Sequence, residues 1–333
     1  MDLLPDVHDW LLDALPGRHI TGTANLQTLW SGYGSIVRVG LDGGPEESVI
    51  VKQVTPPTEK DHPRGWNTNL SHERKLRSYE IESCWYRSWS DQCDANCRVA
   101  KCLAQGTIAG GQVLVLEDLD ASGFSVRRHR LDENGVATGL RWLAHFHATF
   151  MGVDGEGLWP TGTYWHLETR PDEWAAMPNG ALKDAAITID QRLKSAKFQT
   201  LVHGDAKVAN FCFAESFETP PAMVDFQYVG RGCGMKDVAY FLGSCLDESQ
   251  CERMEASHLQ IYFDTLRRSL TERHADRGNK IDVESLEREW RTLYPIAWAD
   301  FVRFLEGWCP GHAKLHRYSQ KIADTAIKNL SDT

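Results

Sequence analysis

The chain has 333 residues, of which 42% are hydrophobic and 25% are charged. This is an ordinary globular composition with enough apolar mass for a large core, and the length suggests two domains or one domain with two lobes. The net charge of −10 makes nucleic acid a poor partner, because binding to its phosphates depends on basic side chains.

The N-terminal residues lack the basic start and the apolar run of a secretory signal. No window contains the roughly 18 apolar residues of a membrane span. The nine cysteines are an odd number, which argues for reduced thiols in a chain without an export signal. We therefore expect a cytoplasmic protein that does not associate with membranes.

The first part of the chain has the pattern of strands with one helix. Runs of β-branched residues predict strands at 36–41 and 48–54, and the turn residues between them predict a hairpin. A helix is expected over 71–90, with Ser71 as its N-cap. A further strand is expected at 113–116.

Helical periodicity dominates from about residue 132 onward. Two short apolar strands interrupt it, at 201–203 and 222–225, and each ends in polar residues. Further helices are expected around residues 183–196, 238–245, 252–269 and 296–308. The pattern predicts an α+β protein of two lobes: a β-rich N-terminal lobe (1–118) and a larger helical C-terminal lobe (119–333).

The strongest chemical signal follows the strand at 201–203. Asp205 and Asn210 lie five positions apart in a loop, and Asp225 ends the next strand and precedes Phe226. Phosphoryl transfer from ATP needs a carboxylate that orients the attacking hydroxyl and oxygen ligands for Mg²⁺. Turn capping or strand-end solvation would explain each residue separately, but the combined spacing favours a phosphotransferase site.

The segment resembles the catalytic and metal-binding loops of the aminoglycoside phosphotransferase and choline kinase superfamily, which has a protein-kinase-like fold. His-Gly-Asp followed by Asp-Phe-Gln is most similar to its ecdysteroid-kinase-like branch. The resemblance implies ATP and Mg²⁺ as cofactors. It also implies that Asp205 is the catalytic carboxylate, that Asn210 and Asp225 are metal ligands, and that His203 braces the loop.

Two further residues match positions of this superfamily and its protein-kinase relatives. Lys207 stands where serine/threonine protein kinases carry a lysine that touches the transferred phosphate, and a catalytic role and a solvated loop lysine are both open. Asp237 opens a helix, so N-capping explains it, and we expect it to support the catalytic loop.

The N-terminal part carries a quieter set of candidates for ATP binding. Gly32, Gly34 and Ser35 precede the first strong strand, where backbone N–H groups could approach phosphates, although an ordinary turn is an equal alternative. Lys52 ends an apolar strand, as does the lysine that contacts ATP phosphates in kinases. Glu82 best fits as its partner on the next helix.

Glu73 and Glu80 remain open as alternative partners of that lysine. The segment from Leu114 to Leu119 resembles the hinge that holds adenine in this superfamily, with Glu117 and Leu119 as the expected positions. Only the backbone acts there, so the side chains of Glu117 and Asp118 are incidental to that role.

The acceptor site is the least defined part of the prediction. Trp298 and Asp300 are candidates for substrate contacts, because an aromatic ring with a carboxylate would suit a cationic group. The alternative is that these side chains belong to the core of the helical lobe. The stretch 159–166, rich in aromatic residues, is another candidate for a pocket wall.

The sequence thus predicts a kinase that transfers the γ-phosphoryl group of ATP to a hydroxyl of a small molecule. A protein kinase is disfavoured, because the eleven residues between Asp225 and Asp237 leave no room for an activation segment. An ATP-binding regulatory module without turnover is the alternative. The identity and charge of the acceptor and the oligomeric state are not predicted.

Overall fold

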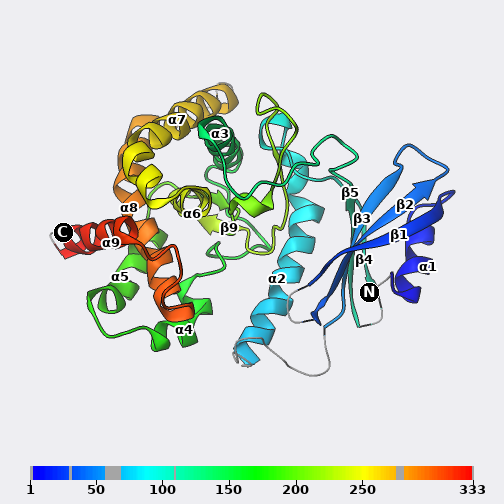
Figure 1. The fold of residues 1–333 in the computed structure, drawn as a ribbon, viewed down its shortest axis with the longest axis horizontal. Helices are drawn as coiled ribbons and strands as arrows, with labels where there is room; N and C mark the ends of the chain where they lie inside the picture. Colours follow the sequence, from blue (N-terminus) through cyan, green and yellow to red (C-terminus); the bar gives the residue numbers. More distant parts are fainter. Residues whose placement is uncertain (1–2, 30–31, 57–68, 109, 275–280, 332–333) are drawn as a thin grey trace. The chain divides into compact units, whose positions relative to one another are not determined.

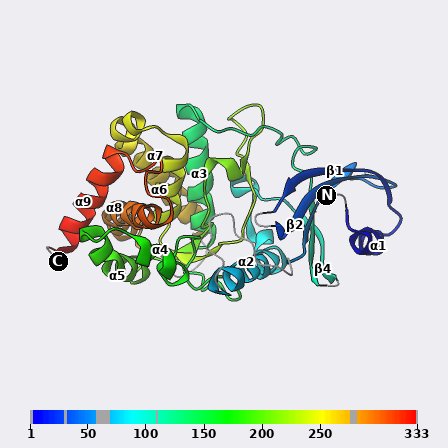
Figure 2. The same ribbon diagram turned by 60° about the horizontal axis from the view of Figure 1, so that its bottom comes forward.

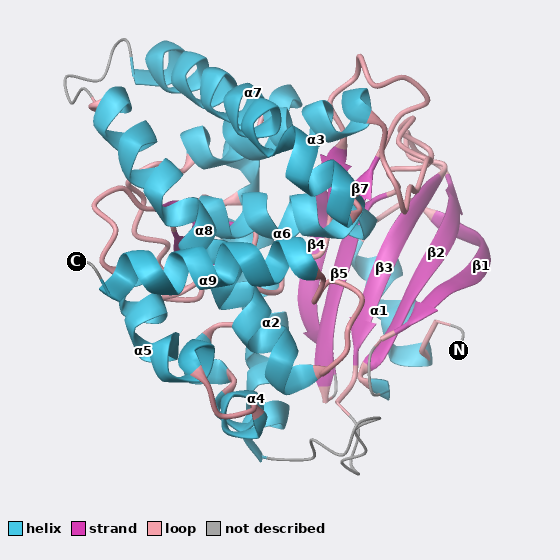
Figure 3. Cartoon of the chain, turned by 60° about the vertical axis from the view of Figure 1, so that its left-hand side comes forward, coloured by secondary structure: helices cyan, strands magenta, loops and turns pink. Residues whose placement is uncertain are grey.

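A computed structural model describes residues 3–29, 32–56, 69–108, 110–274 and 281–331. The chain forms two compact units, one of residues Met1–Asp91 and Val99–Val126, and one of residues Gln92–Arg98 and Arg127–Thr333. The first is β-rich and the second is mainly helical (Figure 3), which confirms the predicted α+β class. The division lies eight residues beyond the predicted boundary at 118, and it assigns 92–98 to the helical unit.

The first unit contains a five-stranded antiparallel sheet, in which the strands lie in the order β1-β2-β3-β5-β4 (Figure 1). One face of this sheet packs on helix α1 (Pro5–Ala14) through Val7 and Leu11. Alternate valines of β2, β3 and β5 complete that core, which is why those three strands were predictable. The strands are β1 (His19–Thr28), β2 (Gly34–Asp42), β3 (Ser48–Val54), β4 (Cys102–Ile108) and β5 (Gly111–Glu117).

Helix α2 (Asn69–Ser88) covers most of the range predicted over 71–90, but it begins before Ser71, which is therefore not its N-cap. Its Tyr79 packs with Tyr33 and Val54 in a second cluster of the same unit. Side chains alternate along β3, so Val51 lies in the core formed with α1 while Lys52 points to the opposite face. Glu82 on α2 meets that lysine.

The second unit consists of seven helices in its described part, with four short strands among them (Figure 2). Strand β6 (Thr200–Val202) pairs with β9 (Gly230–Gly232), and β7 (Phe211–Cys212) pairs with β8 (Ala222–Met223). The helices are α3 (Glu133–Thr149), α4 (Pro171–Ala176), α5 (Ala181–Lys194), α6 (Met235–Cys245), α7 (Glu248–His274), α8 (Val283–Trp308) and α9 (Arg317–Ser331).

Helix α8 is longer than the sequence indicated. Asp282 caps it by accepting a hydrogen bond from the backbone N–H of Ser285, and Pro295 lies within it. Because proline disfavours a helix interior, the prediction started only at residue 296. In the described part of the chain, no helix combines the length and the apolar character needed to cross a membrane.

Candidate active site

Two short pairs of antiparallel strands in the helical unit, β6–β9 and β7–β8, hold the predicted catalytic loop. The loop leaves β6 at His203 and enters β7 after Asn210. In the β7–β8 pair, Phe211 lies opposite Met223, and the N–H of Val224 donates to the carbonyl oxygen of Asn210 at 3.1 Å. Because Asp225 directly follows Val224, this register brings it to the end of the loop that carries Asn210.

Asp205 is buried and forms the centre of the loop. Its Oδ2 accepts hydrogen bonds from Lys207 Nζ at 2.7 Å and from Asn210 Nδ2 at 3.1 Å. Its Oδ1 is also buried and has no hydrogen-bond partner among the described residues. Burial raises the pKa of Asp205, the cation of Lys207 opposes this effect, and the charge of Asp225 adds to it. Oδ2 is thus held in place, and Oδ1 is left to accept a hydrogen bond from a ligand.

Asp225 adopts the left-handed backbone conformation, with φ of 72°. Aspartate tolerates this region better than most residues, and such conformations gather at functional sites. Asn210 uses its Nδ2 on Asp205, which leaves its carboxamide oxygen for a cation. An amide oxygen and a carboxylate are the hard ligands that Mg²⁺ prefers, so the residues present fit the predicted metal.

A buried network orients the loop from behind. Asp237, fully buried, accepts hydrogen bonds from the backbone N–H groups of His203 at 2.6 Å and Gly204 at 3.0 Å, and from His147 Nε2 at 3.2 Å. His203 Nδ1 accepts from the N–H of Asp205, so its Nε2 carries the proton and donates to the carbonyl of Val224 at 3.0 Å. Burial lowers the pKa of His203, which favours this neutral form.

Gly204 is required by this geometry. Its φ is +81°, and a Cβ at this position would meet the carbonyl oxygen of Tyr228 at 2.1 Å. The glycine of the His-Gly-Asp motif therefore allows close packing of the loop on the segment that follows Asp225.

Lys52 and Glu82 form a buried ion pair inside the first unit. Lys52 Nζ lies 2.6 Å from Glu82 Oε2, and the two residues are 5% and 2% exposed. Glu80 instead pairs on the surface with Arg77 at 2.9 Å. The geometry thus identifies Glu82 as a partner of Lys52 and leaves Glu80 on the outer face of α2.

The residues from Gly32 to Ser35, around the start of β2, divide into two kinds. Gly34 has φ of +128°, and a Cβ there would meet the carbonyl oxygen of Gln53 at 2.0 Å, so strand pairing alone demands glycine. Ser35 is fully buried, and its hydroxyl accepts from Gln53 Nε2 at 2.7 Å. Gly32 has φ of +74° with open space around it. Residues 30 and 31 of the same motif lie outside the described residues.

The predicted hinge is held by side-chain contacts within the first unit. The carboxylate of Glu117 accepts from the N–H of Lys101 at 3.1 Å and from Ser122 Oγ at 2.6 Å. Leu119 is buried, and its carbonyl accepts from the N–H of Phe124. Asp118, which we expected to be incidental to adenine binding, forms a two-pronged ion pair with Arg38 at 2.6 and 3.1 Å.

Trp298 and Asp300 are buried in the helical core with their polar atoms engaged. Trp298 Nε1 donates to Ser319 Oγ at 3.1 Å. Asp300 accepts from Trp165 Nε1 at 3.0 Å and from Arg303 at 2.8 Å, and Lys236 Nζ lies 3.4 Å away. These contacts fit the alternative that both side chains belong to the core of the helical lobe, and they leave neither side chain available to a substrate.

Three residues near Asp205 were not predicted individually. The hydroxyl of Tyr164, within the aromatic stretch 159–166, donates to that of Tyr240 on α6 at 3.3 Å. Burial raises the pKa of Tyr240, and the nearby side chains of Tyr164 and Asp205 add to this. Lys314 Nζ lies 4.8 Å from the centre of the Tyr240 ring. No sequence motif links these positions, because they come from three separate segments.

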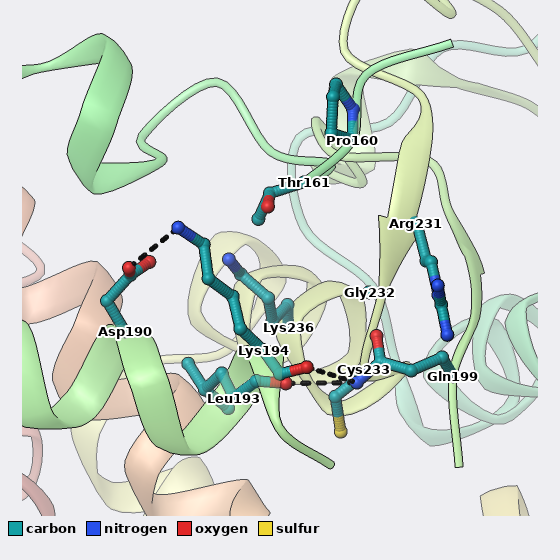
Figure 4. Close-up of a pocket in the computed structure, with 10 residues that line it drawn as sticks. All are labelled: Pro160, Thr161, Asp190, Leu193, Lys194, Gln199, Arg231, Gly232, Cys233 and Lys236. Atoms are coloured by element: carbon teal, nitrogen blue, oxygen red, sulfur yellow. Dashed lines mark hydrogen bonds and ion pairs between the residues drawn. The ribbon is translucent and has the colours of Figure 1, made fainter. Parts of the chain in front are cut away.

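A cavity of about 260 Å³ lies elsewhere in the helical unit, lined by α5, β9 and the start of α6 (Figure 4). Pro160 and Thr161, from the stretch 159–166 predicted as a pocket wall, also line it, but none of the residues predicted for catalysis, metal binding or ATP binding does. Figure 4 shows Lys194 reaching toward Asp190, which it meets at 3.0 Å, and its Nζ also lies 2.5 Å from Glu168. His166 joins these two carboxylates in a cluster of metal-ligand type, but the ammonium group already compensates their charge.

Comparisons with known proteins bear on the predicted resemblance and fold. The ecdysteroid kinase-like family model matches residues 176–274, which include Asp205, Asn210 and Asp225. No curated protein matches the sequence.

Two solved structures show the fold. One, named provisionally as an aminoglycoside phosphotransferase from Ralstonia eutropha JMP134, is 13% identical with a TM-score of 0.51, over 99% of this chain and 96% of that chain. The other, an aminoglycoside phosphotransferase from Streptomyces rimosus ATCC10970 in complex with ADP and streptomycin, is 14% identical with a TM-score of 0.51, over 89% and 100%. The predicted resemblance and the protein-kinase-like fold are confirmed.

Proposed function

We propose that this protein is an ATP- and Mg²⁺-dependent phosphotransferase that acts on a hydroxyl group of a small molecule. The observation that carries the proposal is the carboxylate of Asp205, with Oδ2 fixed by Lys207 and Asn210 and with Oδ1 buried and without a partner among the described residues. A buried acceptor atom without a partner is costly, and an acceptor hydroxyl would satisfy it.

Each residue has a defined role in this reaction. When MgATP is bound, ATP supplies the phosphoryl group and Mg²⁺ neutralises the negative charge of the phosphates. Lys52, held by Glu82, contacts the phosphates, and Asn210 and Asp225 hold the metal through oxygen atoms. Oδ1 of Asp205 accepts a hydrogen bond from the acceptor hydroxyl and aligns it for attack.

The proton and the bonds balance in a single displacement. The acceptor oxygen forms a bond to the γ-phosphorus as the bond to the bridging oxygen breaks, which leaves ADP. The hydroxyl proton passes to Oδ1 of Asp205, whose pKa is already raised by burial, so the carboxylate is a better base than one in water. The ammonium group of Lys207 stabilises the negative charge of the phosphoryl group during its transfer.

The test is ADP release from MgATP in the presence of a panel of small alcohols. Asp205→Asn keeps the size of the side chain and removes the base, so kcat should fall at least about a hundredfold while nucleotide affinity changes little. Asp184→Asn, on the exposed face of α5, is the matched control and should retain full activity. Full activity in Asp205→Asn would exclude the proposed role, and nucleotide binding without any turnover would favour the regulatory module.

A further inference from the structure

The charges near Asp205 bear on the chemistry of the acceptor. This inference rests on the proposed function, because it concerns the molecule whose hydroxyl would meet Asp205. Lys207 already neutralises the carboxylate of Asp205 at 2.7 Å. A further cation in this part of the helical unit therefore bears on which acceptors can bind beside this ion pair.

Lys314 supplies such a charge. It lies in the turn between α8 and α9, where its backbone N–H donates to His312 Nδ1. Its Nζ lies over two aromatic rings, 4.8 Å from the centre of Tyr240 and 5.4 Å from that of Phe301. Burial lowers the pKa of Lys314 to about 8 and the charge of Asp205 opposes this, so the side chain is mostly a cation at neutral pH.

The other cations of this aromatic cluster are matched by carboxylates. Arg170, which lies 5.3 Å from the centre of the Phe304 ring, pairs with Glu173 at 2.9 Å. Lys236 lies 3.4 Å from Asp300. Among the described residues, no carboxylate lies within ion-pair distance of Lys314, so the two rings are its direct contacts and the charge of Asp205 acts on it from farther away.

This arrangement disfavours a cationic acceptor. A second cation beside Tyr240 would be repelled by Lys314 in a partly desolvated site, where charge interactions are stronger than in water. An oxyanion would instead form a charge-assisted hydrogen bond with Nζ, which is among the stronger polar contacts in proteins.

We infer that Lys314 is a specificity-determining residue, and that the acceptor is an alcohol that also carries an anionic group such as a carboxylate or a phosphate ester. The hydroxyl of this molecule meets Asp205 and its oxyanion meets Lys314. The sequence had suggested a cationic group from Trp298 and Asp300, but Asp300 is engaged by Arg303 and Trp165 in the core.

The test compares the binding of three benzyl alcohols that differ only in the charge of a para substituent: 4-(hydroxymethyl)benzoate, benzyl alcohol and 4-(aminomethyl)benzyl alcohol. Isothermal titration at pH 7 should give an affinity for the benzoate at least about tenfold above that for the amine. Lys314→Met keeps the stem over the rings and should abolish the difference. Lys314→Arg should restore it.

Lys197→Met is the matched control, because Lys197 also lies over a ring, that of Phe198 at 5.0 Å, but on the surface. This variant should bind all three alcohols as the wild type does. Equal affinities, a preference for the amine, no binding of the benzoate, or an unchanged preference in Lys314→Met would each overturn the inference. Binding needs no turnover, so failure of the proposed phosphotransfer would appear separately, as ADP release that does not depend on Asp205.

Discussion

Three hydrogen bonds converge on the carboxylate of Asp237. They come from the backbone N–H groups of His203 and Gly204 and from the ring of His147, all inside the helical unit. N-capping was the expectation from sequence, but α6 begins at Met235 with Gly234 at its N-cap, so Asp237 lies in the first turn and does not cap the helix. Its carboxylate instead fixes the first two residues of the catalytic loop, so the position of Asp205 depends on it.

Replacement of Asp237 by alanine should therefore destabilise the protein. The change leaves three buried donors without an acceptor, and the free energy of unfolding should fall by about 3 kcal/mol or more. Urea denaturation followed by circular dichroism measures this. Asp264→Ala, on the exposed face of α7, should change stability by less than about 0.5 kcal/mol. Equal stability of the two variants would contradict the role of Asp237.

The preference for an anionic ligand should also depend on pH. Lys314, with a pKa of about 8, is charged below that pH and loses its proton above it. Of its neighbours, Lys207 has a raised pKa and stays charged, Cys245 has a raised pKa and stays a neutral thiol, and deprotonation of Asp205 acts in the same direction as that of Lys314. The affinity for 4-(hydroxymethyl)benzoate should therefore fall between pH 7 and pH 9, and a constant affinity would contradict this.

At the scale of elements, burial decided what could be predicted. Strands β2, β3 and β5 carry alternating valines that face α1, and their pattern is visible in the sequence. Strand β1 is exposed along almost its whole length and has a polar sequence, so no periodicity marked it, and α1 and β4 were missed as well. The first half of α8 was missed because Pro295 suggested a break. Tertiary packing outweighed local propensity in that helix.

Gly32, just before β2, and Gly34, its first residue, should respond differently to replacement by alanine. Gly34→Ala places a Cβ against the carbonyl oxygen of Gln53 and should lower stability by about 3 kcal/mol or more, with or without a nucleotide. Gly32→Ala meets no atom within 4 Å and should cost only about 1 kcal/mol, for its positive φ. Thermal unfolding of both variants measures the difference. Because Gly32→Ala disturbs the fold little, a loss of ATP affinity in this variant can be attributed to weaker contacts with the phosphates.

At the scale of the whole molecule, the predicted residues are distributed over both units. Lys52 and Glu82 lie in the first, and Asp205, Asn210 and Asp225 lie in the second. Each set was predictable because its members are close in sequence or follow a known spacing. Tyr164, Tyr240 and Lys314 were not, because their proximity depends on how a loop, α6 and the turn after α8 pack together.

Nucleotide binding should stabilise the folded chain in a metal-dependent way. A ligand that binds only the folded state raises stability by about 2.7 kcal/mol at a hundred times its Kd, so MgADP should raise the melting temperature by several degrees. ADP with EDTA should raise it less. In Asp225→Ala the effect of Mg²⁺ should disappear while the melting temperature without ligand changes little. An unchanged response to Mg²⁺ in this variant would remove Asp225 from the metal site.

The most direct test of the central claim is to identify the phosphorylated product. An acceptor that stimulates ADP release should be recovered by mass spectrometry as its phosphate monoester, with about one ester formed per ADP released, and neither should form with Asp205→Asn. Release of ADP with inorganic phosphate and no ester, or ester formation that persists in Asp205→Asn, would contradict the assignment of Asp205 as the group that directs an acceptor hydroxyl to the γ-phosphate of ATP.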